Sequence, residues 1–311
     1  MEKEIKMGTV KTMSTTISLL DELFQTCKER LENIYIKYLT NVPSLELKSA
    51  MEYTLFNGGK RIRPLLIYAT GCVFNAPFEN MDIPASAVEL IHTYSLIHDD
   101  LPCMDNADLR RGKPSCHKAY PEGIAILTGD ALHTLAIQII SNHPAPLKVT
   151  KRLQMLSILS KACGPFGMAA GQALDITVMN NRHISKELLE EIYRLKTGAL
   201  LSTCIELGRL SSDDDDEFNE EALKKFGYCI GLAFQIQDDI LDMEASTALL
   251  GKEQGIDAKN NKITYPHIHG LTEAKERVQM LYQESLEAIN YLGVKAHLLR
   301  ELTAYMLQRK K

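Results

Sequence analysis

The sequence has no uninterrupted apolar run approaching the roughly 18 residues that a membrane-spanning helix needs. Its N-terminus carries Glu2 and Glu4 and lacks the apolar core of a secretory signal, so we expect neither membrane insertion nor secretion. Its seven cysteines show no C-x₂-C pairing, which argues against a zinc site and indicates reduced thiols in a cytoplasmic protein. The net charge of −5, with acids and bases mixed along the chain, argues against nucleic-acid binding.

Proline and glycine are scarce, with 11 and 18 among 311 residues, and most lie between long periodic segments. No internal repeat and no alternation typical of paired β-strands is visible. We therefore predict an all-α fold, with a polar arm at residues 1–15 and one domain over residues 16–311. The predicted helices cover approximately residues 16–39, 44–56, 59–75, 122–142, 149–163, 165–179, 185–210 and 272–309, and the stretches that end at Asp100 and begin at Glu221.

Two acidic clusters lie in otherwise apolar segments. They read His98-Asp99-Asp100-Leu101-Pro102-Cys103-Met104-Asp105, with Arg110 and Arg111 shortly after, and Gln235-Ile236-Gln237-Asp238-Asp239-Ile240-Leu241-Asp242. Because Pro102 cannot sit inside a helix, Asp99 and Asp100 are expected in the last turn of one, where their charge opposes the helix dipole. Stability alone would not place two acids there.

The second cluster forms one stripe on a helix, because its polar residues fall at i, i+3, i+4 and i+7. A solvated surface face is the plain alternative for such a stripe. The three acids repel one another with no base among them, and a cation would remove that repulsion. Oxygen ligands favour a hard cation such as Mg²⁺, which commonly joins a few carboxylates to substrate phosphates. Two distant clusters thus suggest carboxylates that face each other across a cleft.

Cationic segments accompany the acidic ones. Gly58-Gly59-Lys60-Arg61-Ile62-Arg63-Pro64 places three cations beside a flexible turn, and glycines allow close approach of an anion to the backbone. Arginine binds phosphate oxygens through two hydrogen bonds. Each of these cations alone is more often a surface residue, but together with two acidic clusters they suit a substrate that carries a diphosphate.

These motifs resemble those of the trans-isoprenyl diphosphate synthases, in the branch of bacterial-type farnesyl diphosphate synthases. The two acidic clusters are similar to the two aspartate-rich motifs of that family, and the resemblance runs from about residue 20 to the C-terminus. Other segments that match in the expected order are Gly58 to Pro64, Gly171-Gln172-Ala173-Leu174-Asp175, Lys196-Thr197-Gly198 and Gly251 to Pro266. One departure is Met243-Glu244-Ala245-Ser246-Thr247, where the family often has a Gly-Asp pair.

The resemblance implies a bundle of long, mostly antiparallel helices around a deep central cavity, assembled as a homodimer. It also implies a Mg²⁺-dependent reaction, with about three ions per site and with Mn²⁺ as a substitute. An allylic diphosphate, dimethylallyl or geranyl, ionises, and isopentenyl diphosphate attacks the resulting cation head-to-tail. A proton is then lost, with the released diphosphate as the base. The family activity is that of a geranyltranstransferase and a dimethylallyltranstransferase.

Residue roles follow from the same resemblance, position by position. The expected metal ligands are Asp99, Asp100, Asp105, Asp238, Asp239 and Asp242. The allylic diphosphate is expected to meet Arg110, Lys196, Thr197, Gln235, Lys252 and Lys262, of which the first four are also the expected catalytic residues. Isopentenyl diphosphate is expected to meet Lys60, Arg63, His92 and Arg111. Gln172 and Asp175 are expected mainly as supporting partners.

Product length is expected to depend on Tyr94, with Ser95 beside it, because Tyr94 lies five positions before Asp99 and therefore about 7.5 Å deeper along the helix. The resemblance implies that an aromatic residue here closes the pocket at a C15 product. Ordinary helix packing of Tyr94 is the alternative. A geranylgeranyl diphosphate synthase is the main alternative function, and a class I terpene cyclase and a non-catalytic partner subunit are the others.

Overall fold

The structure, a computed structural model, describes residues 18–178, 184–212, 219–248 and 263–308. Helices form almost all of it, so the prediction of an all-α bundle is confirmed. The predicted N-terminal arm, Lys252 and Lys262 lie outside the described residues. In chain order the elements are α1 (Leu19–Leu39), α2 (Leu45–Leu55), α3 (Ile62–Val73), α4 (Phe78–Asp99), β1 (Leu109–Arg110), β2 (Lys113–Pro114), α5 (Cys116–Ala119), α6 (Glu122–Asn142), α7 (Val149–Cys163), α8 (Met168–Val178), α9 (Lys186–Tyr193), η1 (Arg194–Gly198), α10 (Ala199–Leu210), α11 (Glu220–Ala248), α13 (Tyr265–His269), α14 (Leu271–Ala288), η2 (Asn290–Ala296) and α15 (His297–Gln308).

Local sequence signals account for several helix ends. Ser18, Ser44 and Ser185 each accept a backbone N–H in the first turn of α1, α2 and α9, which satisfies a donor that the helix itself cannot pair. The predicted end of a helix at the first acidic cluster is confirmed, because α4 ends at Asp99. That helix begins at Phe78, six residues before the internal Pro84.

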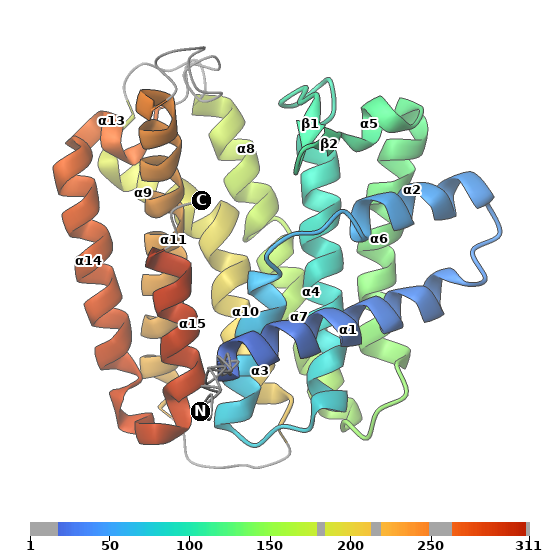
Figure 1. The fold of residues 1–311 in the computed structure, drawn as a ribbon, viewed down its shortest axis with the longest axis horizontal. Coiled ribbons are helices and arrows are strands. Elements are labelled where there is room, and N and C mark those ends of the chain that lie inside the picture. Colours follow the sequence, from blue (N-terminus) through green and yellow to red (C-terminus); the bar gives the residue numbers. More distant parts are fainter. Residues whose placement is uncertain (1–17, 179–183, 213–218, 249–262, 309–311) are drawn as a thin grey trace, which may run out of the picture.

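Helices α4 and α11 carry the two acidic clusters, and both pack within the bundle. Helix α4 packs against α3 and α6, α10 packs against α3 and α11, and α11 packs against α14. Figure 1 shows the C-terminal end of α4 leading toward the β1–β2 hairpin at one end of the bundle. The predicted apolar stripe of α11 is buried, since Leu223, Phe226 and Ile230 are at most 6% exposed.

Three local features differ from the sequence-based expectation. The predicted helix over residues 185–210 is interrupted by the π-helical turn η1, which holds Lys196 and Thr197. The predicted helix over residues 272–309 is broken at Gly293, whose φ of 56° is left-handed. The antiparallel hairpin of β1 and β2 was not predicted, because each strand has two residues and shows no alternation.

Helix α6 is, in the described part of the chain, the one helix long and apolar enough to cross a membrane by length and composition. It packs against α4, α2 and α7, and its buried positions include Ala125, Leu132, Ala136 and Ile140. Such a helix is weak evidence for a membrane span, because the core helices of bundles pass the same test.

Helix α8 approaches the η1 turn so closely that only glycine fits at one position. A Cβ atom on Gly171 would lie 2.3 Å from the backbone nitrogen of Lys196 and 2.6 Å from its Cα atom. Backbone atoms cannot turn aside as a flexible side chain can. The close contact therefore holds the backbone of Lys196 against α8.

We predict that Gly171→Ala lowers the free energy of unfolding by about 1–3 kcal/mol, because the added methyl group forces α8 and η1 apart. Denaturant titration of the purified variant measures the change. Gly123→Ala is the matched control, since a Cβ there meets nothing within 4 Å. Equal stability of the two variants would contradict the close packing of α8 on η1.

Candidate active site

Two adjoining cavities lie between α4, α8, η1 and α11. The larger, of about 750 Å³, is lined mainly by residues with polar or charged side chains, and the smaller, of about 410 Å³, exposes a mostly apolar surface. The two cavities share Arg63, His92, Leu96 and Thr197. A charged compartment thus continues directly into an apolar one.

The first acidic cluster folds back on itself after α4. The backbone N–H of Asp105 donates to the carbonyl of Asp99 at 2.9 Å, which brings the two acids to one turn, and Asp99 lines the smaller cavity. Burial raises the pKa of Asp99 to about 6, although the charge of Lys196 opposes this. The carboxylates of Asp105 and Asp100 contribute to this rise in pKa, and the charge of Arg110 also opposes it. The Asp99 carboxylate therefore lies where a cation would stabilise its charged form.

Asp100 has a different environment from its neighbour Asp99. It is 2% exposed and forms a two-pronged ion pair with Arg110, whose Nε lies 3.0 Å from Oδ2. Arg110 lines the larger cavity. A paired carboxylate of this kind fixes the plane of the guanidinium group. Asp100 thereby orients Arg110 at the cavity wall.

The opposite wall is formed by α11 and η1. Asp238 and Gln235 line the larger cavity, and Thr197 donates to Gln235 Oε1 at 2.8 Å. Lys196 lines the smaller cavity and is paired with Asp175 at 2.7 Å. The structure thus brings together the expected supporting partner Asp175 and the expected diphosphate ligand Lys196.

The two remaining acids of the second cluster do not line either cavity. Asp239 is 4% exposed and is surrounded by Tyr193, Gln235 and the backbone of Tyr265. Burial and the Asp239 carboxylate raise the pKa of Tyr193 well above its usual value, so the phenol remains a donor. Asp242 lies one turn further along α11 and is half-buried.

Cations form the wall of the larger cavity away from α11 and Asp238. Lys60 and Arg63 come from the segment before and within α3, and Arg111 comes from the hairpin. Arg111 donates to the carbonyl of Gly58 at 2.5 Å, which joins the two segments. Glycine is favoured at position 59 because its φ of 112° is one that other residues rarely adopt.

Electrostatics mark this wall as a site for an anion. Burial lowers the pKa of Arg111, and the neighbouring Arg61, Arg110 and Arg63 lower it further, against the attraction of Glu89. Burial and the same arginines hold the pKa of His92 well below 6.5, so its imidazole is neutral. Crowded cations repel one another at a cost that a bound diphosphate would relieve.

The smaller cavity contains the residues expected to set product length. Tyr94 and Ser95 line it, together with Met104, Met168 and Ile176. The Tyr94 ring meets two histidines edge to face, with ring centroids 5.7 Å from His98 and 5.0 Å from His133 of α6. The ring is therefore held between α4 and α6 beside the cavity.

The acids of the two clusters are suitable ligands for a hard cation, but the protein alone does not supply a complete set of ligands. No group of three His, Cys, Asp or Glu side chains within residues 18–178, 184–212, 219–248 and 263–308 is close enough to hold a metal. Asp99 and Asp105 meet on one turn, and Asp238 lies on the facing helix. All are oxygen donors, and Mg²⁺ usually completes such a partial set with water and substrate phosphates.

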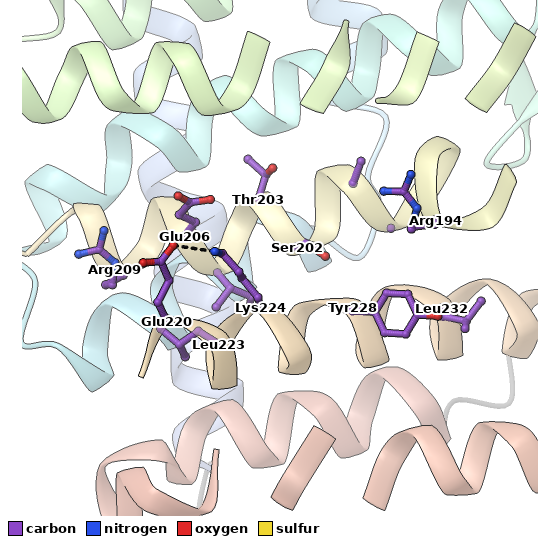
Figure 2. A pocket seen from close by; sticks show the side chains of 13 residues that line it. Arg194, Ser202, Thr203, Glu206, Arg209, Glu220, Leu223, Lys224, Tyr228 and Leu232 are labelled. Atoms are coloured by element: carbon purple, nitrogen blue, oxygen red, sulfur yellow. Dashed lines mark ion pairs between the residues drawn. The ribbon is translucent and has the colours of Figure 1, made fainter. Parts of the chain in front are cut away.

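Another pocket, of about 340 Å³, lies between α10 and α11 and is lined by other residues (Figure 2). Its cation Lys224 is paired with Glu220 at 2.7 Å, as the dashed line in Figure 2 shows, and Arg194 is paired with Glu191. None of its lining residues is one of the predicted site residues. We therefore place the chemistry in the two adjoining cavities.

The predictions from sequence did not include the residues that support the cationic wall. Arg61 adopts a left-handed φ of 50°, and its guanidinium group contacts Glu89, which is 1% exposed. Asn57 donates to the carbonyl of Arg110 at 3.1 Å. The one available signal was an isolated Glu89 in an apolar helix, since an acid buried in this way needs a partner.

Comparisons with known proteins find related sequences and related solved structures. The profile of a family described as polyprenyl synthetase matches residues 44–295. The chain is 42% identical to a farnesyl diphosphate synthase of Escherichia coli over 92% of this chain and 98% of that protein. It is 44% identical to a chloroplastic geranylgeranyl pyrophosphate synthase of Capsicum annuum, over 78% of this chain and 66% of that protein. The crystal structure of a Helicobacter pylori geranyltransferase complexed with magnesium and isoprenyl diphosphate has a TM-score of 0.77 and 34% identity, and covers 94% of this chain and 98% of that one.

We predict that His92 makes folding less favourable as the pH falls below 6.5, because only the unfolded state then binds its proton. The loss in the free energy of unfolding that His92 causes is at most about 1.4 kcal/mol for each pH unit. Denaturant titrations of the wild type and of His92→Gln at pH 7, 6 and 5 measure it. The variant is expected to lose less stability toward pH 5. Parallel pH profiles would contradict a neutral His92 in the folded protein.

Proposed function

The chain belongs to the polyprenyl synthetase family, and on that premise we propose that it makes farnesyl diphosphate. It condenses isopentenyl diphosphate head-to-tail with dimethylallyl or geranyl diphosphate, and residues 16–311 act as one synthase domain. The observation that carries the proposal is the pair of adjoining cavities. One is lined by cations of the α3 segment and the hairpin and by Asp238 of α11, and the other exposes a mostly apolar surface beside Tyr94.

The cationic wall suits the diphosphate of isopentenyl diphosphate. Lys60, Arg63 and Arg111 supply positive charge, and the neutral imidazole of His92 supplies a hydrogen-bond donor that costs no further charge repulsion. A terpene cyclase uses one diphosphate and needs no second cationic subsite of this kind. The wall therefore favours a synthase that holds two diphosphates at once.

The allylic diphosphate is assigned to the junction of the two cavities. Arg110, oriented by Asp100, and Lys196, oriented by Asp175, bind its oxygens and neutralise charge on the leaving group. Thr197 and Gln235 face the same space with their oxygen dipoles, which stabilise the allylic cation as the carbon–oxygen bond breaks. Lys252 and Lys262 are proposed to join this set. The apolar cavity keeps water from the cation.

We assign the metal ions to Asp99, Asp105 and Asp238. The first two lie together at the turn that follows α4, and Asp238 lies on α11 in the wall of the larger cavity. Asp242, one turn beyond Asp238 and outside both cavities, is proposed as a further ligand of these ions. Bound Mg²⁺ supplies charge neutralisation for the diphosphate leaving group. About three ions per site are proposed, and Mn²⁺ is proposed to substitute for Mg²⁺. A related geranyltransferase structure holds magnesium together with isoprenyl diphosphate, which supports this assignment.

Overall sequence identity does not distinguish a C15 from a C20 product, because relatives of both kinds are 42–44% identical to this chain. The residue that supports C15 is Tyr94. Its ring, held between His98 and His133, stands at the apolar cavity where a growing chain descends from the diphosphate. Ser95, the next residue, also lines the apolar cavity, and its small side chain leaves room there for the growing chain.

We propose a cytoplasmic homodimer. All seven cysteines are unpaired thiols, as expected in a reducing compartment. Ile126, Leu127 and Ile137 of α6 are 39–53% exposed, and Ile126 and Ile137 lie about 20° apart around that helix. Exposed apolar groups on one face are typical of a surface that another subunit covers.

The proposed function predicts farnesyl diphosphate as the terminal product when the protein is incubated with Mg²⁺, isopentenyl diphosphate and either dimethylallyl or geranyl diphosphate. Mass spectrometry of the extracted products measures chain length. EDTA is expected to abolish turnover, and added Mg²⁺ is expected to restore it, because the leaving diphosphate needs its charge neutralised. Elongation that persists without divalent metal would contradict the mechanism, and a C20 product would favour the geranylgeranyl alternative.

We predict that Tyr94→Ala lengthens the product beyond C15, because removal of the ring deepens the apolar cavity. The matched control is Tyr94→Phe, which keeps the ring and its edge-to-face contacts and is expected to keep the C15 product. The product distribution of both variants is measured by the same mass spectrometry. If Tyr94→Ala still stops at C15, another side chain sets the length.

A further inference from the structure

The carboxylate of Asp239 is enclosed by hydrogen-bond donors from three elements. Tyr193 of α9 donates its hydroxyl to Oδ2, the backbone N–H of Tyr265 at the start of α13 donates to the same oxygen at 3.0 Å, and Gln235 Nε2 lies 3.3 Å from Oδ1. Asp239 is 4% exposed, and the Tyr193 and Tyr265 side chains are 3% and 1% exposed. Both oxygens of this buried acid are therefore engaged by the protein.

Its neighbour Asp238 has the opposite environment. Consecutive residues on a helix point about 100° apart, so the two acids cannot face the same way. Asp238 lines the larger cavity together with Lys60, Arg110 and Arg111, whereas Asp239 lines neither cavity. A metal ligand must turn an oxygen lone pair toward the ion and its substrate. Asp238 meets that requirement, and Asp239 is turned toward α9 and α13.

The contacts of Asp239 fix the direction of a hydrogen-bond chain that reaches the substrate. A carboxylate only accepts hydrogen bonds, so the Gln235 amide must turn its NH₂ group toward Asp239. Gln235 Oε1 then faces Thr197, whose hydroxyl must donate to it at 2.8 Å. Because its hydroxyl hydrogen is committed to Gln235, Thr197, which lines both cavities, can present only oxygen lone pairs to a substrate there. These are the oxygens that the proposed mechanism turns toward the allylic cation.

We propose that Asp239 is a positioning residue and not a metal ligand: it sets the orientation of the Gln235 amide and, through it, of the Thr197 hydroxyl. The role rests on the proposed function, because the chain ends at the groups that would stabilise the allylic cation. It replaces the sequence-based interpretation of Asp239 as a metal ligand.

The first acidic cluster shows the same division of roles, which supports the proposal independently. Asp99 lines a cavity, whereas Asp100 is 2% exposed and is occupied by the guanidinium group of Arg110. In each Asp-Asp pair the first acid therefore faces the reaction space and the second is turned into the protein. The second acid orients a substrate-facing side chain, Arg110 in one motif and Gln235 in the other.

The test compares two isosteric variants of adjacent residues, Asp239→Asn and Asp238→Asn. Metal affinity is measured without turnover, by Mn²⁺ electron paramagnetic resonance titration in the presence of inorganic diphosphate. We expect Asp239→Asn to keep the Mn²⁺ affinity within about threefold of the wild type and Asp238→Asn to weaken it about tenfold or more. In steady-state assays Asp239→Asn is expected to lower kcat about tenfold or more, with KM for both substrates and the Mg²⁺ half-saturation concentration nearly unchanged.

Tyr193→Phe provides a second variant that leaves every acid in place. It removes one donor to Asp239, and we expect a smaller fall in kcat with unchanged Mn²⁺ affinity. It also keeps the proposal testable if Asp239→Asn does not fold, which thermal unfolding would reveal. Weakened Mn²⁺ binding in Asp239→Asn to the level of Asp238→Asn would overturn the proposal, and so would an unchanged kcat in Tyr193→Phe. Failure of the proposed function itself would appear separately, as a wild type that forms no prenyl product.

Discussion

Placing several carboxylates in a partly buried cleft is the constraint on which this structure depends. An acid removed from water without a partner costs several kcal/mol, so each one must face a cation or be tied to donors. The fold satisfies the requirement by splitting each Asp-Asp pair. Asp99 and Asp238 face the reaction space, where a bound metal ion can supply positive charge, while Asp100 and Asp239 are paired inside the protein.

The cationic wall obeys the same constraint with the opposite sign. Arg61 is neutralised by the buried Glu89, which leaves the charge of the neighbouring Lys60 and Arg63 on the cavity side. His92 stays neutral among the arginines, so it adds a donor without adding repulsion. The site is therefore arranged for anions before any anion binds, and little rearrangement is needed at the moment of reaction.

Much of the fold could be predicted from the sequence because its signals are local. Pro102 and the acids before it predicted the end of α4, and the periodicity of Leu223, Phe226 and Ile230 predicted the buried face of α11. The features that were missed have weak local signals. The η1 turn at Lys196 packs against Gly171 on α8, and the hairpin turns through only two residues, Arg111 and Gly112, which both have a positive φ.

The sequence by itself determined the helices, the order of the motifs and the chemistry of the acids and cations, because periodicity, proline positions and residue types are properties of the chain. Only the tertiary structure decided which member of each acidic pair faces the cavity and which is buried. The reason is physical: adjacent side chains on a helix diverge, and their fate depends on the elements packed around them. For Asp239 those elements are α9 and α13, which lie more than 20 residues away in the chain on either side.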